Sequence, residues 1–234
     1  MKLPCEKATT YYKTIIDQRN TGSYSFTLDK EYTGTLLFVG NGGGGNSSQK
    51  DSQWWSASGG SGACFEGVVR LPAGTYTFVL GTLGYGSNVN NTHFNSGGLN
   101  STNSYLQDSN GNVLITVGCG AKGNTNYTST TGGVGGTLTL GTLDVVDTII
   151  ARNGNQTVGN SGAGSLSAYD NTYTGYGAGT CGTYGAGTVY AIAGIAKLTL
   201  ITDKNNFDYF INSGDFKVIK QTENNVDVYK GVNK

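Results

Sequence analysis

Charge, proline and long apolar runs are scarce in this chain of 234 residues. Fifteen basic residues balance fifteen acidic ones, and only fourteen of these thirty side chains lie between residues 21 and 202. Such a surface lacks the basic patches with which proteins bind nucleic acid or anionic membranes. No stretch approaches the roughly 18 consecutive apolar residues that suggest a transmembrane helix. We therefore expect neither a nucleic-acid partner nor a membrane span.

Residues that carry enzyme or metal chemistry are equally sparse. The chain has one histidine, His93, and the nearest acidic residue in sequence is Asp108. The spacing of the four cysteines matches no zinc pattern, so we interpret them as small buried residues, although a disulfide between two of them stays open. These cysteines are Cys5, Cys64, Cys119 and Cys181. Asp144 and Asp147 flank two valines and would point to opposite faces of a strand, which disfavours a glycosidase pair.

Two stretches, 118–123 and 177–182, spell the GxGxxG pattern of dinucleotide-binding sites. Such a site requires a helix directly after the glycines, which places its N-terminus at the pyrophosphate. The sequence NTNYTSTTGG, which follows the first stretch, does not suit that helix. With 39 glycines in the chain, matches of this kind arise by chance. We expect no cofactor, no metal and no enzyme activity.

Glycine is the dominant feature, and it is gathered in short tracts separated by apolar and β-branched segments. Examples are GGGG at 42–45, SGGSGA at 58–63 and GGVGG at 132–136. Glycine at every third position with abundant proline is absent, which excludes collagen. Two structures are open for the tracts. They could form short polyproline II helices packed side by side, as in polyglycine II, or tight turns and bulges with positive φ.

The segments between the tracts predict strands, and we expect an all-β, β-sandwich-like domain with glycine-rich loops. A hairpin is expected from 63–71 and 75–81, and a second from 104–108 and 113–118 with a type I′ turn at Asn110-Gly111. Residues 188–201 are expected to form a closing strand pair. The other predicted strands are 23–28, 33–40, 137–151, 206–212, 215–221 and 225–232.

The distribution of charge divides the chain into three parts. Residues 1–20 form a lead-in or attachment segment, in which YYKTIIDQ suits a short strand or a helical turn. Residues 21–202 form the glycine-rich β domain. Residues 203–234 form a charged, strand-rich tail, which is either a docking segment or a small sheet capping the same domain.

The order of these strands and tracts resembles the glycine-rich domain of tailed-bacteriophage tail-fibre and receptor-binding proteins. The matching blocks are 36–45, 69–81 with LPAGTYTFVLG, 100–123 with LITVGCGAKG, and 185–200. The resemblance covers roughly residues 23–202. It implies a virion or fibre-tip protein that contacts a host surface through variable polar and aromatic loops, and in some relatives such an adhesin caps a separate trimeric fibre. Cys119, Thr180 and Cys181 interrupt the tracts, which is a departure from the family pattern.

Aromatic residues in polar loops are the candidates for receptor contact. Tyrosine and tryptophan give rigid contact area at low entropy cost, and their rings stack on sugars. Trp54 and Trp55 lie together in SQKDSQWWSASGG, outside any strand pattern, although one of them could instead fill the core beneath the loop. The remaining candidates are Tyr85, His93, Tyr127, Tyr173 and Tyr176, with Tyr169 and Tyr184 in similar surroundings.

The N-terminal residues indicate where the protein is expected to act. PCEKATTYYK follows Met1–Leu3 without the apolar run of a signal peptide, which favours a virion protein released by lysis. The expected partners are other virion or fibre subunits and a host-surface saccharide or protein. A homotrimer is compatible with this class, but no heptad pattern enforces one. The alternatives are a capsid or fibre decoration protein, a secreted bacterial surface adhesin and, with less support, an ice-binding protein or an enzyme.

Overall fold

The computed structural model describes residues 11–50, 53–88, 99–125, 130–157, 164–180, 187–202, 216–223 and 226–233. For 48–50, 53–55, 87–88, 187–189 and the last two ranges, only the backbone is described. These residues form strands, turns and extended segments without a helix, so the all-β prediction is confirmed. No helix long and apolar enough to cross a membrane occurs in this part of the chain.

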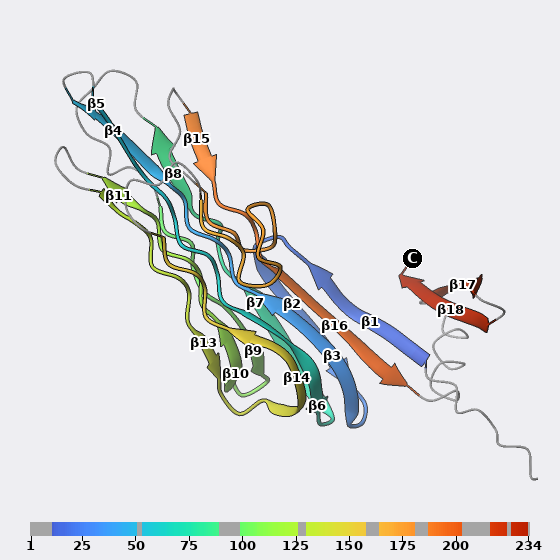
Figure 1. Cartoon of the computed structure of the whole chain (residues 1–234). Coiled ribbons are helices and arrows are strands. Elements are labelled where there is room, and N and C mark those ends of the chain that lie inside the picture. The colour runs from blue at the N-terminus through green and yellow to red at the C-terminus, as the bar shows by residue number, and fades with distance from the viewer. Residues whose placement is uncertain are drawn as a thin grey trace, which may run out of the picture.

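Two five-stranded antiparallel sheets make up the larger end of the molecule (Figure 1). The first has the order β1-β16-β3-β6-β14, with bounds Tyr11–Gln18, Ile195–Thr202, Tyr32–Val39, Cys64–Leu71 and Asp144–Arg152. The second has the order β13-β10-β9-β7-β2, with bounds Leu138–Leu140, Val113–Val117, Ser104–Asp108, Gly74–Leu80 and Gly22–Leu28.

The two sheets pack against each other as a sandwich around one apolar core. Alternate side chains of β3 are fully buried, among them Leu36 and Phe38, as period-two patterning requires. Across the interface, the rings of Phe38 and Phe78 meet edge to face with centroids 5.3 Å apart. Leu106 and Ile115 from the second sheet are also fully buried in this core. The sandwich therefore draws its stability from interlocking side chains of both sheets.

Two predicted pairings and one predicted strand are wrong, because consecutive strands lie in different sheets or in different parts of the molecule. β6 and β7 do not form a hairpin: Pro72 and Ala73 carry the chain from the first sheet to the second. The segment 137–151 is likewise divided between β13 in the second sheet and β14 in the first. In 188–201, β15 (Gly187–Tyr190) pairs with β8 (Tyr85–Asn88), while β16 pairs with β1 and β3.

The hairpin of β9 and β10 is confirmed, but its turn differs from the prediction. Gly111 has φ of 82°, whereas Asn110 is not in the positive region, so the turn is not type I′. The amide of Gly111 donates to the carbonyl of Asp108, and the amide of Asp108 donates to the carbonyl of Asn112. Four residues, 109–112, thus connect the strands, and Gly111 takes the left-handed conformation.

Both flanking segments contain strands. YYKTIIDQ forms β1, which pairs with β16 at the edge of the first sheet and so lies in the sandwich rather than ahead of it. In the tail, β17 (Phe216–Glu223) and β18 (Val226–Asn233) form an antiparallel hairpin. The predicted strand 206–212 lies outside the described residues.

Between the sandwich and the opposite end runs a bundle of extended, non-strand segments, which we call the glycine bundle. It comprises 40–45, 58–63, 81–84, 100–103, 118–123, 132–136, 153–157, 177–180 and 191–194. Four excursions of the chain leave the sandwich, traverse this region and return: between β3 and β6, β7 and β9, β10 and β13, and β14 and β16. The segments run side by side in Figure 1.

The hydrogen bonds of the bundle repeat every three residues. In segment 58–63, residues three apart bond to the same neighbouring segment, at donor–acceptor distances of 2.8 to 2.9 Å. The amides of Gly59 and Gly62 donate to the carbonyls of Thr180 and Gly177, in segment 177–180. The amides of Gly60 and Ala63 donate to the carbonyls of Ala121 and Gly118, in segment 118–123. The carbonyls of Ser58 and Ser61 accept from the amides of Gly133 and Gly136, in segment 132–136. Three residues per turn is the period of the polyproline II helix. The tracts are therefore packed in the manner of polyglycine II.

Glycine is required in the bundle by close packing and not by positive φ. Among the described tract glycines only Gly177 has positive φ, at 67°. A Cβ placed on Gly59 would overlap the carbonyl of Gly43, and one placed on Gly60 would overlap the carbonyl of Val134. The turn-and-bulge interpretation thus applies at Gly177 alone, and the other tract glycines let backbones approach one another.

Three short two-stranded sheets lie beyond the bundle, at the end away from the sandwich (Figure 1). β4 (Asn46–Lys50) pairs with β5 (Gln53–Ala57), β8 pairs with β15, and β11 (Asn124–Thr125) pairs with β12 (Thr130–Thr131). Contacts of β4 with β8 and with β11 join the three pairs. We call this group of strands the tip.

Candidate functional site

Trp54 and Trp55 lie on β5 of the tip. The prediction that they lie outside any strand is wrong, because β5 pairs with β4 in a regular antiparallel register, Trp54 opposite Gln49 and Trp55 opposite Ser48. Both ends of this hairpin are anchored in the glycine bundle: Ala57 is fully buried, and the Asn46 side-chain amide donates to the carbonyl of Gly123 at 2.6 Å. The tryptophans are thus placed on a strand pair held by the bundle.

Tyr85 also belongs to the tip, at the start of β8. It stands opposite Tyr190 of β15, with ring centroids 6.0 Å apart. Tyr85 is half-buried, whereas Tyr190 is 62% exposed. Tyr190 was not among the sequence candidates, since TVYAIAG reads as core strand and nothing in it indicates an exposed ring.

His93, Tyr127 and Tyr184 lie outside the described residues. The described strands that flank them all belong to the tip: β8 precedes His93, and β11 and β12 stand on either side of Tyr127.

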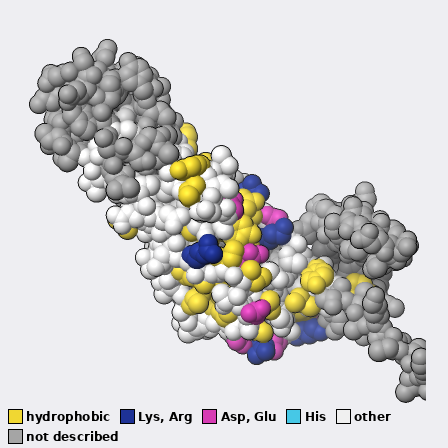
Figure 2. All heavy atoms as spheres, viewed as in Figure 1, with side chains coloured by type: hydrophobic (Ala, Val, Ile, Leu, Met, Phe, Trp, Pro, Cys, Tyr) yellow, Lys and Arg dark blue, Asp and Glu magenta, His cyan; other side chains and the backbone are white. Residues whose placement is uncertain are grey.

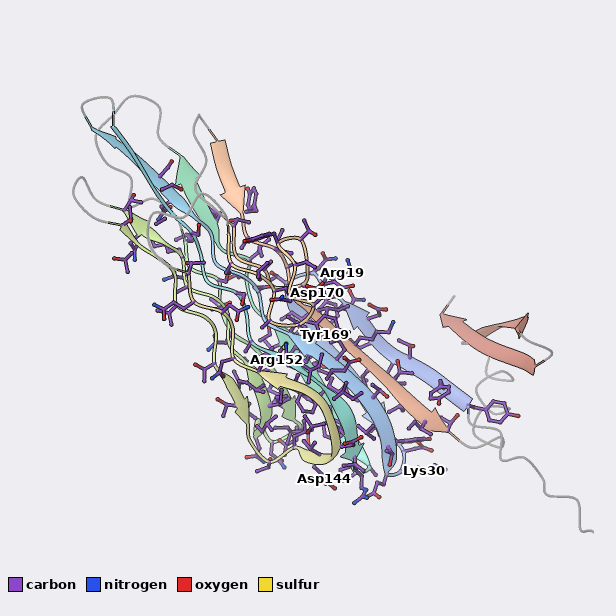
Figure 3. The ribbon with its side chains drawn as sticks, viewed as in Figure 1. Arg19, Lys30, Asp144, Arg152, Tyr169 and Asp170 are labelled. Carbon is purple, nitrogen blue, oxygen red and sulfur yellow. The ribbon has the colours of Figure 1, made fainter. Side chains whose placement is uncertain are left out.

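Tyr173 and Tyr176 do not belong to the tip. They lie in the loop 164–176, which packs on the outer face of the first sheet through Ala168 and Tyr169. Figure 3 shows Tyr169, Asp170 and Arg19 together on this flank. The structure thus divides the predicted site residues into a tip group and a flank group.

Within the flank group, Tyr176 is a packing residue and Tyr173 is exposed. The guanidinium of Arg19 lies 4.6 Å from the ring centroid of Tyr176 and donates to its hydroxyl oxygen. The rings of Tyr176 and Tyr169 are 6.2 Å apart. Burial raises the pKa of the Tyr169 phenol, and the nearby carboxylate of Glu66 raises it further. Tyr173 is 54% exposed.

Two of the cysteines are described, and both are free thiols. Cys64 is fully buried beside Val39 and Ala168, and burial raises its pKa to about 11. Cys119 is half-buried and donates from Sγ to the carbonyl of Ser101 at 3.0 Å. Cys64 thus fills a small buried position, as the sequence predicts. Among the described residues, no three His, Cys, Asp or Glu side chains are grouped as metal ligands would be.

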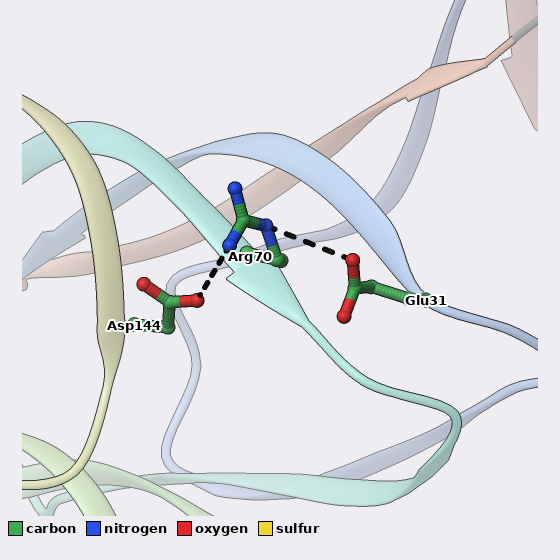
Figure 4. Close-up of polar contacts among 3 residues, drawn as sticks. All are labelled: Glu31, Arg70 and Asp144. Atoms are coloured by element: carbon green, nitrogen blue, oxygen red, sulfur yellow. Dashed lines mark hydrogen bonds and ion pairs between the residues drawn. The ribbon is translucent and has the colours of Figure 1, made fainter.

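Charged side chains of the sandwich form ion pairs on its surface. Arg70 contacts Asp144 at 3.2 Å and Glu31 at 3.7 Å (Figure 4), and all three side chains are about half exposed. Asp144 therefore has an ion-pair partner on β6, in agreement with the interpretation of this region as a solvated edge. In the described part of the face in Figure 2, neutral polar and backbone atoms predominate, with small groups of apolar and charged side chains among them.

Comparison of the sequence with protein-family models and with curated proteins finds no match.

Proposed function

We propose that this chain is a non-enzymatic structural protein of a tailed-bacteriophage virion, a tail-fibre or fibre-tip adhesin that binds the host cell surface. The proposal combines the resemblance in strand and tract order with the separation of the molecule into a sandwich, a glycine bundle and a tip. Each part has a role in it: the sandwich end joins the particle, the bundle acts as a stiff spacer, and the tip presents the contact surface.

The observation that carries the proposal is the position of the tip strands. β4, β5, β8, β11, β12 and β15 are gathered at the end of the bundle away from the sandwich. Recognition residues are commonly placed on connections that a rigid scaffold holds together. The bundle supplies such a scaffold, because its segments are hydrogen-bonded to one another and its glycine positions leave no room for a Cβ.

The chemistry of the tip suits a carbohydrate or a polar protein surface. Trp54 and Trp55 occupy strand positions of β5, and the rings of Tyr85 and Tyr190 lie on β8 and β15. The paired strands around them are rich in Asn, Ser, Thr and Gly. Aromatic rings offer flat apolar area with little loss of side-chain entropy on binding. Neutral hydrogen-bonding groups beside them suit the hydroxyls of sugars.

The partners at the other end are virion or fibre subunits. The lead-in 1–20, which contains β1, and the tail 203–234 are the segments that we assign to docking, with a trimeric fibre as one arrangement. Both carry more charge than the middle of the chain, with six charged residues in 1–20 and ten in 203–234.

The proposal is tested by binding of the full-length, fluorescently labelled chain to host cells, together with immunogold microscopy of virions. We expect saturable binding to cells and gold at tail or fibre tips. Joint replacement of Trp54 and Trp55 by alanine is expected to weaken cell binding about tenfold or more, because aromatic anchors dominate interface energies. Tyr12→Ala is the matched control, since Tyr12 is 54% exposed on β1, away from the tip.

The other outcomes decide between the alternatives. Gold on the capsid with no binding to cells would make the chain a decoration protein. Cell binding without gold on any particle would favour a secreted surface adhesin. Equal loss of binding in the tryptophan variant and in Tyr12→Ala would contradict recognition by the tip.

A further inference from the structure

A polar pocket of about 350 Å³ lies on the flank of the glycine bundle. Its volume is at the lower end of the range of about 300–1,000 Å³ for small-molecule sites. It is formed between the bundle segment 153–157 and the start of the loop 164–176. The polar side chains that line it are Asn155, Gln156, Thr157, Ser165 and Asn171.

The wall formed by 153–157 is fixed by the bundle. The amide of Asn155 donates to Ser61 Oγ at 2.7 Å, and the Thr157 hydroxyl donates to the carbonyl of Ser58 at 2.8 Å. The Asn155 side-chain amide crosses to the opposite wall, where it donates to the carbonyl of Leu166 at 2.9 Å. The two walls are therefore joined to each other and to the central segment of the bundle.

The opposite wall is a loop held by its own hydrogen bonds. The amide of Asn171 donates to the carbonyl of Ser167 at 3.0 Å, and the amide of Ser167 donates to the carbonyl of Thr172 at 2.8 Å. Asp170 accepts from the amide of Thr172 at 3.1 Å. Asn171 has φ of 58° and is the one non-glycine residue with positive φ among those described. This backbone is thus fixed before any ligand arrives.

The pocket side chains retain hydrogen-bonding capacity. Ser165 Oγ accepts from the amide of Gly179 at 3.0 Å, and its O–H has no acceptor among the residues that the structure describes. Thr157 Oγ1 donates and can also accept a hydrogen bond. The side-chain amides of Gln156 and Asn171 make no hydrogen bond with the described part of the chain, and each offers two donors and one acceptor oxygen. No lining side chain is ionisable.

We propose that this pocket binds one neutral sugar unit of a surface polysaccharide. Alternating donors and acceptors on a rigid frame suit the vicinal hydroxyls of a sugar ring, and the lack of a cation at the pocket disfavours acidic sugars and phosphates. The pocket is separate from the tip strands, so the assignment stands whether or not the tip binds host cells.

The assignment is tested on the full-length chain by saturation-transfer-difference NMR and by ¹⁵N-detected titration. The probes are glucose, galactose and N-acetylglucosamine, with N-acetylneuraminic acid and inorganic phosphate as charged probes. We expect saturation transfer from at least one neutral sugar, with millimolar affinity and shifts at 155–157 and 165–171, and none from the charged probes.

Two variants sharpen the test without disturbing the fold. Asn171→Gly removes the side-chain amide and retains a residue that adopts positive φ without strain. Gln156→Ala removes the second amide from an exposed position. Together the two substitutions are expected to lower the affinity for the sugar about tenfold, since each removes hydrogen bonds to the ligand. The matched control is Asn110→Gly, at an exposed turn of the sandwich.

Several results would overturn the assignment: no transfer from any neutral sugar, equal binding of neutral and charged probes, or an unchanged affinity in the double variant. Shifts confined to tip residues would also overturn it and would place sugar binding at the tip instead. Because the tryptophan variant tests the tip alone and the Asn171 and Gln156 variants test the pocket alone, the two proposals fail separately.

Discussion

In the sandwich the interior is made of large apolar side chains, whereas in the glycine bundle it is made mostly of backbone, with a few small or polar side chains. Phe38, Phe65 and Phe78 fill the space between the sheets and are fully buried. In the bundle the corresponding space is closed by carbonyl and amide groups that contact glycine α-carbons directly. Hydrophobic transfer and dispersion stabilise the first region, and hydrogen bonds with close backbone contact stabilise the second. A side-chain core accepts other shapes of similar volume, whereas a backbone core has no volume to exchange.

The largest expected effect is that of adding one carbon to the bundle. Gly60→Ala would place a Cβ on the carbonyl of Val134, and the backbone of segment 132–136 would have to move. We expect a loss of more than about 3 kcal/mol in the free energy of unfolding, measured by denaturant titration.

Gly111→Ala is the control for this substitution. Gly111 has open space around it and φ of 82°, so only backbone strain of about 1–2 kcal/mol applies. If Gly60→Ala cost no more than Gly111→Ala, the bundle would not be close-packed as described.

The second effect is removal of a side chain that ties the bundle together. Asn41 is buried; its amide donates to the carbonyl of Gly81 at 2.9 Å, and its oxygen accepts from the amide of Gly194 at 2.9 Å. Asn41→Ala leaves buried backbone groups without partners, and we expect a loss of about 2–3 kcal/mol by the same titration. Asn153→Ala, at an exposed asparagine that accepts from Leu138 at 2.8 Å, should cost clearly less. Equal losses would show that burial of Asn41 contributes nothing.

A smaller effect is expected from a change of shape in the sandwich core. Leu106 is fully buried, and Leu106→Met keeps nearly the same volume. We expect a loss below about 1.5 kcal/mol, with the native state still uniquely packed by NMR line shape. Leu106→Ala, which leaves a cavity, should cost about 2–5 kcal/mol. A methionine variant as unstable as the alanine variant would remove the contrast between the two regions.

The smallest effect belongs to the surface. Asp144→Asn removes the ion pair between Asp144 and Arg70. The Arg70 side chain is 45% exposed and the Asp144 side chain is 53% exposed. The expected loss is about 0.5 kcal/mol or less, and salt should reduce it further. Thermal unfolding at low and high ionic strength measures both the loss of stability and its dependence on salt. A loss of the same size in high salt would mean that Asp144 acts through β14 packing instead.

Local structure was predictable from the sequence where period-two patterning is clean. The strands β2, β3, β9 and β10 lie within a few residues of their predicted ranges, and the β9–β10 hairpin is confirmed. Alternation identifies the face of a strand that is buried, but it does not identify the neighbouring strand. β6 and β7 therefore looked like a hairpin although the chain changes sheet between them.

The tip and the pocket were less accessible to sequence reasoning. Trp54 and Trp55 lie in a polar stretch without alternation, and β5 exists because Asn46 and Ala57 are fixed in the bundle at its base. Pocket residues such as Asn155 and Asn171 come from two segments that the Asn155 side chain joins through its hydrogen bond to the carbonyl of Leu166. Glycine and asparagine at these positions carry no pattern that indicates which neighbours they meet.

The three-residue period of segment 58–63 also restricts how such a molecule can change length. Inserting or deleting one residue within a bundle segment rotates every later donor by about 120°, onto the wrong neighbour. Insertions or deletions of three residues restore the facing groups. Lineages descended from this chain should therefore change the length of the glycine bundle only in whole turns.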